Sequence, residues 1–161
     1  MGNSEITVFQ AVTMSIALVG AVLGIINTWF SFDRERLKLK VVPVYAQPIG
    51  AMDPRINFGI NITNMSAFPI TVSEVGVLYD GRTERGAITL PIVIDGGKFP
   101  RRLEPRSSFS VYADITTQAP KLFSLVRCAY AKTDCGNLVE GKSLALADMK
   151  KAFNQENENF V

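Results

Sequence analysis

The chain begins with a long apolar run and then changes to a short alternation of apolar and polar residues. No Lys, Arg, Asp or Glu occurs between Ile6 and Phe32, and a helix that spans a bilayer needs about 20 mainly apolar residues. We therefore predict one transmembrane helix over residues 6–32, after a short head at residues 1–5. A buried core helix is the ordinary alternative, but so small a domain has little room to bury every face of it.

The charges that flank this helix predict its direction. The head contains no Lys or Arg, whereas four basic residues follow the apolar run closely: Arg34, Arg36, Lys38 and Lys40. The positive-inside rule then predicts a single-pass protein of the cell inner (plasma) membrane, with its N-terminus outside and its C-terminal domain in the cytoplasm. A cleaved signal peptide is disfavoured because its basic n-region is missing. Residues 33–37 are the expected basic juxtamembrane linker, and the four cations are candidate contacts for anionic lipid.

Small residues recur within the predicted membrane span. Ala17, Gly20 and Gly24 have a spacing that lets two helix backbones approach closely. Glycine is also common in membrane helices that do not associate. We keep these three residues as a candidate helix–helix contact, through which the chain would form a homo-oligomer.

Beyond residue 37, apolar positions alternate with polar ones. Residues 55–64 give the clearest case, because every second residue from Ile56 to Ile62 is apolar. This period predicts a strand with one face in the core and one in solvent. Further strands are predicted at residues 38–45, 70–79, 87–94, 107–113, 122–132 and 137–146. Pro43 makes the first of these an edge strand or a bulge.

About seven short strands, separated by frequent turn signals, are typical of an all-β antiparallel sandwich or small barrel. We expect this domain to cover residues 38–146. A one-residue slip of the apolar pattern near Ser73 and Glu74 predicts a β-bulge. The last two strands should form a hairpin that turns at residues 133–136.

That hairpin contains both cysteines of the chain. A turn centred on residues 133–136 would place Tyr130 opposite Val139 and Cys128 opposite Gly141, with Cys135 in the turn. The two thiols would then be too far apart for a disulfide. We expect Cys128 to be a small core residue.

The C-terminal end changes back to helical spacing. Leu146, Met149 and Phe153 recur at intervals of three and four residues, so residues 145–154 should form a short amphipathic helix. We expect residues 147–161 to hold this helix and a mobile tail. Packing on its own domain is the ordinary role of such a helix, and docking to a partner is the alternative.

The composition argues against several kinds of chemistry. There is no histidine, which removes the commonest general base and the commonest metal ligand. We expect no enzyme activity, no catalytic residue, no cofactor and no metal site. The formal net charge of +2 does not indicate a nucleic-acid partner.

One stretch of the predicted domain is markedly basic. It contains Lys98, Arg101, Arg102 and Arg106, and arginine is well suited to binding phosphate groups. These four residues are therefore candidate contacts for an anionic ligand or for lipid head groups. A solvated loop is the ordinary alternative.

Three segments carry a resemblance to a known class: the strand, turn and strand over Ile60–Val77, the Leu103-Glu-Pro turn that leads to Phe109, and the last hairpin. Together with the anchor they resemble small bacterial membrane-anchored proteins that have an N-terminal transmembrane helix and an immunoglobulin-like β-sandwich. The resemblance implies the fold and no particular activity. This chain differs in having Arg106 where a turn glycine is usual.

Two functional hypotheses follow from these patterns. In the first, the helix is anchored in the bilayer and the cytoplasmic β-sandwich serves as a protein-interaction or assembly module, with a protein partner or a second copy of the chain. In the second, the chain is a ligand-sensing membrane effector. An anionic ligand near Arg101, Arg102 and Arg106 would make it oligomerise and perturb the bilayer.

Overall fold

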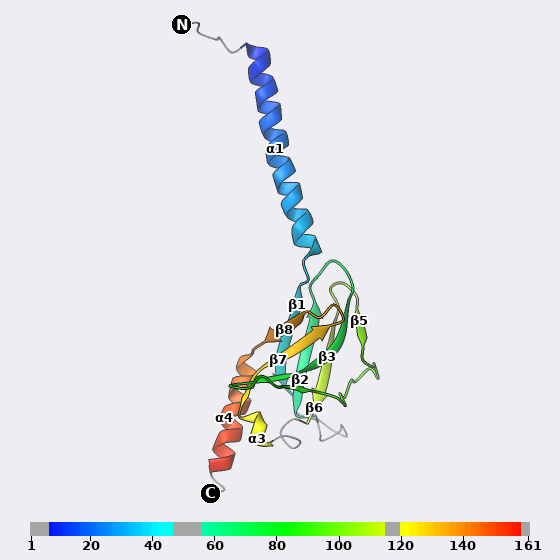
Figure 1. Cartoon of the computed structure of the whole chain (residues 1–161), viewed down its shortest axis with the longest axis vertical. Helices are drawn as coiled ribbons and strands as arrows, with labels where there is room; N and C mark the ends of the chain where they lie inside the picture. The colour runs from blue at the N-terminus through cyan, green and yellow to red at the C-terminus, as the bar shows by residue number, and fades with distance from the viewer. Residues whose placement is uncertain (1–6, 47–55, 115–119, 159–161) are drawn as a thin grey trace. The chain divides into compact units, whose positions relative to one another are not determined.

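The computed structural model describes residues 7–46, 56–114 and 120–158. It divides the chain into two compact units, Met1–Arg36 and Leu37–Val161. The first unit contains the helix α1, and the second, which we call the β domain, contains two antiparallel sheets and the helices α3 and α4 (Figure 1).

Helix α1 spans Val8–Glu35, and none of its residues is buried. At its start, the backbone N–H of Thr7 donates to Oε1 of Gln10 over 3.1 Å, which is half of a capping box. Inside the helix, hydroxyl groups donate to backbone carbonyls four residues earlier. These pairs are Thr13 with Phe9, Ser15 with Ala11 and Thr28 with Gly24. The apolar run therefore exposes few unsatisfied donors.

The helix is longer at its C-terminal end than the apolar run predicted. It continues through Asp33, Arg34 and Glu35 before Arg36 adopts an extended conformation. Three residues of the expected linker at 33–37 are thus helical. The reason is that charged residues mark the end of an apolar segment but have ordinary helix propensities.

The first sheet has the strand order β1-β2-β6. It consists of β1 (Leu39–Tyr45), β2 (Phe58–Asn64) and β6 (Ser108–Ala113). Strand β1, which contains Pro43, is at the end of this sheet, as the proline predicted.

The second sheet has the order β4-β3-β7-β8, and β5 also pairs with β3. It consists of β3 (Ile70–Tyr79), β4 (Arg85–Ala87), β5 (Arg101–Leu103), β7 (Val126–Thr133) and β8 (Leu138–Gly141). The pairing of β3 with β7 shifts register between Val72 and Glu74, which confirms the bulge predicted at Ser73 and Glu74.

The strand predicted at residues 87–94 does not form. Strand β4 ends at Ala87, and the only pairing found in the rest of that range is a single bridge between Ile92 and Tyr112. Pro91 and the turn that begins at Ile94 leave too short a segment between them for a strand. Conversely, β5 lies inside the stretch expected to be a basic loop. The described residues thus contain eight strands in two sheets where about seven were predicted.

The register of the last hairpin differs from the prediction by one residue. Tyr130 is opposite Glu140, not Val139, and Gly141 is opposite Ala129, not Cys128. The hairpin closes with a bond from the Thr133 N–H to the carbonyl of Asn137, one residue beyond the expected turn. Gly136, at φ +84°, supplies the left-handed conformation that this longer loop requires.

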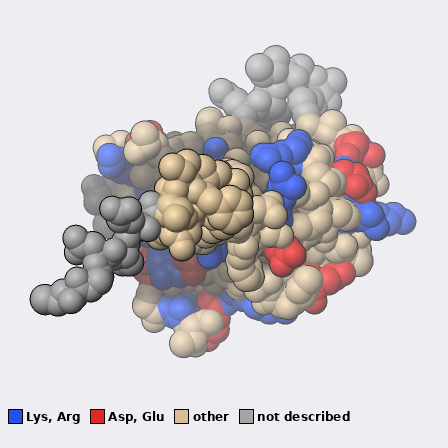
Figure 2. All heavy atoms as spheres, turned by 90° about the horizontal axis from the view of Figure 1, so that it is seen from above, with Lys and Arg blue, Asp and Glu red and all other residues tan. Residues whose placement is uncertain are grey.

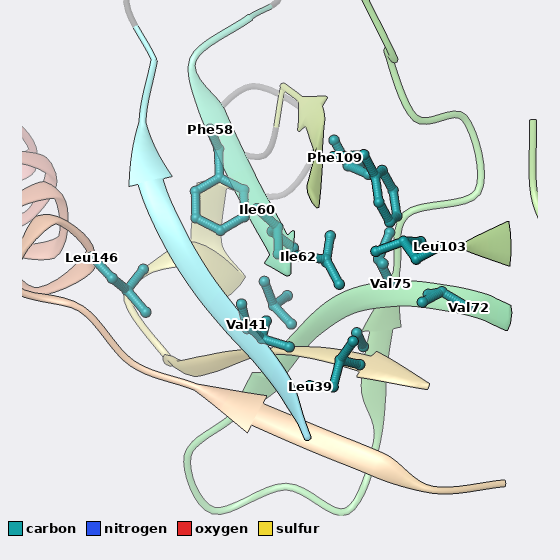
Figure 3. Packing of buried hydrophobic residues seen from close by; sticks show 14 of the residues in the cluster. Leu39, Val41, Phe58, Ile60, Ile62, Val72, Val75, Leu103, Phe109 and Leu146 are labelled. Carbon is teal, nitrogen blue, oxygen red and sulfur yellow. The ribbon is translucent and has the colours of Figure 1, made fainter. Parts of the chain in front are cut away.

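The inner faces of the two sheets enclose a continuous apolar core (Figure 3). Fully buried members include Phe58, Ile60 and Ile62 of β2 and Val72 of β3. The alternation along residues 55–64 predicted this inward face correctly, because successive side chains of a strand point to opposite sides.

The C-terminal helix α4 (Leu144–Glu158) packs on its own domain, together with the short α3 (Pro120–Phe123). Leu146 is buried, and Met149 and Phe153 pack against the core. The Phe153 ring meets Phe123 edge to face, with ring centres 5.3 Å apart. The apolar face predicted from the helical spacing is thus used inside the domain.

A buried asparagine joins two turns at the end of the domain where β1 begins. Asn64 is fully buried, and its Nδ2 donates to the carbonyls of Phe68 (2.8 Å), Leu103 (3.2 Å) and Glu104 (3.2 Å). Its Oδ1 accepts the Ser66 N–H over 2.9 Å. This one side chain fixes the β2–β3 turn against the β5–β6 turn.

Candidate functional site

The candidate helix–helix contact lies on an uncovered part of α1. Ala17, Gly20 and Gly24 are all exposed. A Cβ atom added to either glycine would have no neighbour within 4 Å outside its local helix. The small residues therefore have space for a second helix, and self-association through them stays a prediction.

The four basic residues that follow the apolar run are all exposed. Arg34 is in the last turn of α1, Arg36 directly follows the helix, and Lys38 and Lys40 lie at the start of the β domain. Cations near a helix C-terminus also interact favourably with the helix dipole. Their contact with lipid stays a prediction.

The basic stretch at residues 98–106 is divided by two ion pairs. Both terminal nitrogens of Arg101 donate to the carboxylate of Asp95, at 2.8 Å for Nη1, and the guanidinium lies 4.7 Å from the centre of the Phe109 ring. These bonds from Arg101, with one from the backbone of Gly97, hold the pKa of Asp95 well below its usual range. Arg102 pairs with Glu104 over 3.0 Å.

The other two cations of this stretch are Lys98 and Arg106. Both are exposed, and no ion-pair partner is found for either among the described residues. Arg106 has φ +62°, so it occupies the left-handed turn position in which glycine is usual. Two of the four basic residues are thus paired with carboxylates and two are not, and binding of an anionic ligand here stays a prediction.

Charges on the surface seen in Figure 2 are mixed in sign. Lys and Arg side chains alternate there with Asp and Glu side chains, and neither sign forms a continuous block. On this face the charges give no patch of one sign, and the absence of a nucleic-acid partner stays a prediction.

The edge of β6 away from β2, which we call the free edge, combines a cavity with backbone groups that have no partner among the described residues. On that side of the strand, the described chain contributes one pairing: Tyr112 and Ile92 exchange two backbone hydrogen bonds of 2.8 Å each. Beside the edge lies an open cavity of about 340 Å³. It is lined by Asn61, Val93, Ile94, Asp95, Ser108, Phe109, Ser110 and Tyr112.

A second cavity, of about 580 Å³, lies between α4 and the start of β2. Its walls are mainly apolar and include Phe123, Met149 and Phe153, with Asn57 and Asp148 as polar members. Tyr45, at the end of β1, also lines this cavity.

The most strongly perturbed tyrosine has a structural role. Tyr130 is fully buried, its hydroxyl donates to Glu74, and Nε of Arg85 pairs with the same carboxylate over 3.0 Å. Burial, with the Glu74 contact, raises the pKa of Tyr130, so the phenol stays protonated and donates to Glu74. Among the residues that the structure describes, no group of three or more His, Cys, Asp or Glu could hold a metal ion.

Sequence patterns missed the free edge of β6 because its signals are not local. Ser108 and Ser110 are ordinary solvent-facing positions of a strand, and only the observed strand order makes them part of an edge. Ile92, which pairs with Tyr112 beside this edge, lies within the strand predicted at residues 87–94, but the pattern does not indicate which strand it pairs with. Comparisons with family models, with curated proteins and with solved structures found no match to this chain.

Proposed function

We propose that this protein is a membrane-anchored interaction module: α1 spans a bilayer, and the β domain binds a protein partner or a second copy of the chain. The observation that carries the proposal is the unburied helix. Val8–Glu35 has 28 residues, and its most apolar segment has a mean hydropathy of 2.1. None of that segment is buried. Fractionation tests it, because the protein should stay in the membrane pellet at alkaline pH and leave it with detergent.

The orientation is the next part of the proposal. The cations that follow α1 support a cytoplasmic β domain in the inner (plasma) membrane. We expect activity from a reporter that is fused to the C-terminus and that functions only in the cytoplasm. Activity of a matched reporter that functions only outside the cytoplasm would reverse the orientation.

We also propose that the β domain is an immunoglobulin-like sandwich. Such sandwiches pair strands A, B, E and D in one sheet, and G, F and C, with C′ in the variable type, in the other. Taken in chain order, β1-β2-β6 corresponds to A-B-E and β8-β7-β3-β4 corresponds to G-F-C-C′, whereas β5, in the place of D, pairs with β3 and not with β6. The correspondence supports a binding role, because domains of this kind commonly present edges and loops to partners.

Self-association through α1 has its own test. Replacing Gly20 and Gly24 together with Leu would separate two helices that meet at these residues. We expect a detergent-resistant oligomer to be lost in this variant, and replacing Val19 and Leu23 with Ala is the matched control. An oligomer that survives the glycine replacements would move the contact to the β domain.

An affinity pull-down of the full chain from solubilised, crosslinked membranes tests the interaction role directly. A stoichiometric partner supports an adaptor, and recovery of the chain alone as a crosslinked oligomer supports self-assembly. Recovery of uncrosslinked monomer alone would refute both forms of the proposal.

A further inference from the structure

We propose that the free edge of β6 docks an extended, acidic segment of a partner protein, which adds a strand to the β1-β2-β6 sheet. This inference rests on the proposed role of the β domain as an interaction module, and it names the surface and the chemistry of the partner. Strand addition obtains affinity from backbone hydrogen bonds and specificity from the pockets beside them.

The backbone groups of the edge are the first part of the argument. In an antiparallel strand, the N–H and C=O groups of alternate residues point to the same side. Because Tyr112 directs both groups to Ile92, those of Ser110 and Ser108 point to the same free side. Among the described residues, no backbone bond reaches either serine from that side. The N–H and C=O groups of Ser108 and Ser110 are thus available to an added strand, in line with the backbone pairing of Tyr112 and Ile92.

The chain itself begins this extra strand and then leaves it. A continued antiparallel ladder would place Ile94 opposite Ser110. Instead the chain turns: the Gly96 N–H donates to the Val93 carbonyl over 3.0 Å, and the Asp95 carboxylate is held by Arg101. The turn ends the ladder, so none of the described residues forms a backbone pair with Ser110 or Ser108 on the free side of β6, and Ile94 is left 68% exposed beside the edge.

The cavity beside the edge contains an unmatched acceptor. Oδ1 of Asn61 is buried and has no hydrogen-bond partner among the described residues. Asn61 is the register partner of Ser110, so both side chains lie on the same face of the sheet. A residue added opposite Ser110 would project its side chain on this face, where a hydroxyl or amide group could donate to Asn61.

Charge indicates the chemistry of the added segment. Arg106 lies two residues before Ser108 and has no ion-pair partner among the described residues. A second cation, Lys40 of β1, lies in the same row of the sheet as Ser108, because both are in register with Thr63. The neighbouring acids Asp95 and Glu104 already pair with arginines. A segment antiparallel to β6 would have its C-terminal end near Arg106. Its acidic side chains should therefore lie on the C-terminal side of the residues that pair with Ser110 and Ser108.

Binding to the full chain in detergent micelles tests the proposal. The probe is a synthetic peptide of alternating Thr and Val that ends in three Glu residues, and the control ends in three Lys residues. We expect the acidic peptide to bind at least about tenfold more tightly, and to slow amide exchange at Ser108 and Ser110 by a similar factor. Equal binding of the two peptides, no binding, or protection confined to other strands would overturn the proposal.

Two variants sharpen the test without disturbing the fold. Ser110→Pro removes an N–H group from the free side of an edge strand, where proline is tolerated, and it should abolish peptide binding. Arg106→Gly removes a cation at a position whose φ of +62° suits glycine and should weaken binding about threefold. Arg82→Gln, a charge loss in the β3–β4 turn, should leave binding unchanged. Unaltered binding to Ser110→Pro would overturn the proposal.

Failure of this inference can be told from failure of the proposed function. A partner that is captured equally by the wild-type chain and by Ser110→Pro would leave the interaction role intact and refute the edge as its site. If Ser110→Pro loses a self-associated oligomer and the wild-type chain does not bind the acidic peptide, the edge binds a second copy of the chain. That result would also refute an acidic partner segment as the occupant of the edge. Capture of nothing by the wild-type chain would refute the function itself.

Discussion

The apolar side chains of α1 and those of β2 have opposite surroundings. In α1, Ile16 and Leu18 are 68% and 69% exposed, whereas in β2, Ile60 and Ile62 are completely buried. Burial of apolar surface is favourable by about 25 cal/mol per Å², so the β domain supplies its own apolar environment and α1 does not. A bilayer is the environment that would cover α1. This difference predicts that mutations in α1 reduce membrane association without unfolding the β domain, and that mutations in the β domain reduce its stability without changing membrane association.

The largest expected effect is on the helix. Replacing Leu18 and Val22 together with Arg should cost about 5 to 7 kcal/mol of membrane insertion, because one arginine near the helix centre costs about 2.5 to 3.5 kcal/mol. The variant should leave the alkaline membrane pellet, while the β domain keeps its unfolding transition. Replacement of both residues with Ala is the control and should stay in the membrane. If the Arg variant stayed too, α1 would not be the anchor.

The reciprocal change lies in the core of the β domain. Phe58 is fully buried between the sheets (Figure 3), and Phe58→Ala should lower the free energy of unfolding by about 4 kcal/mol, through lost burial and the cavity left behind. Denaturant unfolding of the full chain in micelles measures it. Membrane fractionation should not change, and a loss of membrane association would show that the two units depend on each other.

Much of this contrast could be predicted from the sequence. An uncharged run of this length and a strict alternation such as Ile56–Ile62 are local signals, and each gave an element of the correct kind in the correct place. The bulge near Ser73 and the packed face of α4 were also predicted, because both follow from where the apolar period breaks or changes.

Features that depend on distant residues could not be predicted. Strand β5 lies within a basic stretch, and its pairing with β3 becomes visible only when the two strands meet. The bond between Arg101 and Asp95 across a turn was missed for the same reason. This bond and the Arg102–Glu104 pair neutralise two of the four basic residues at 98–106, and binding of an anion by this stretch stays a prediction.

Two asparagines on β2 differ in hydrogen bonds that could not be predicted from the sequence, and this difference provides the next prediction. Asn64 makes four hydrogen bonds between two turns, whereas Oδ1 of Asn61 makes none within the described chain. Asn64→Ala should destabilise the β domain by about 3 kcal/mol, because it leaves buried carbonyls and an N–H without partners. Asn61→Ala is the matched control, and denaturant unfolding should place it within about 0.5 kcal/mol of wild type. Equal effects would remove the distinction between the two residues.

The smallest expected effect is a pH dependence at the turn beside the β6 edge. Bonds from Arg101 and from the Gly97 backbone hold the pKa of Asp95 below that of an unfolded aspartate, which is about 3.9. The folded state therefore binds this proton less readily than the unfolded state. The resulting stabilisation is present above about pH 4 and is lost as the pH falls through the lowered value.

Asp95→Asn removes the titrating group and should reduce the difference in stability between neutral and acidic pH. Unfolding of the wild type and the variant should differ most at neutral pH and converge in acid, and Asp148→Asn, at an exposed carboxylate of α4, is the control. Because the Asp95 side chain is 56% exposed, solvent weakens the pair, so this effect ranks below the others. A constant difference at every pH would mean that Asp95 acts through the shape of its turn and not through its charge. In that case Asp95→Asn should also alter amide exchange at Ile92 and Tyr112, whose pairing begins the edge that this turn leaves open.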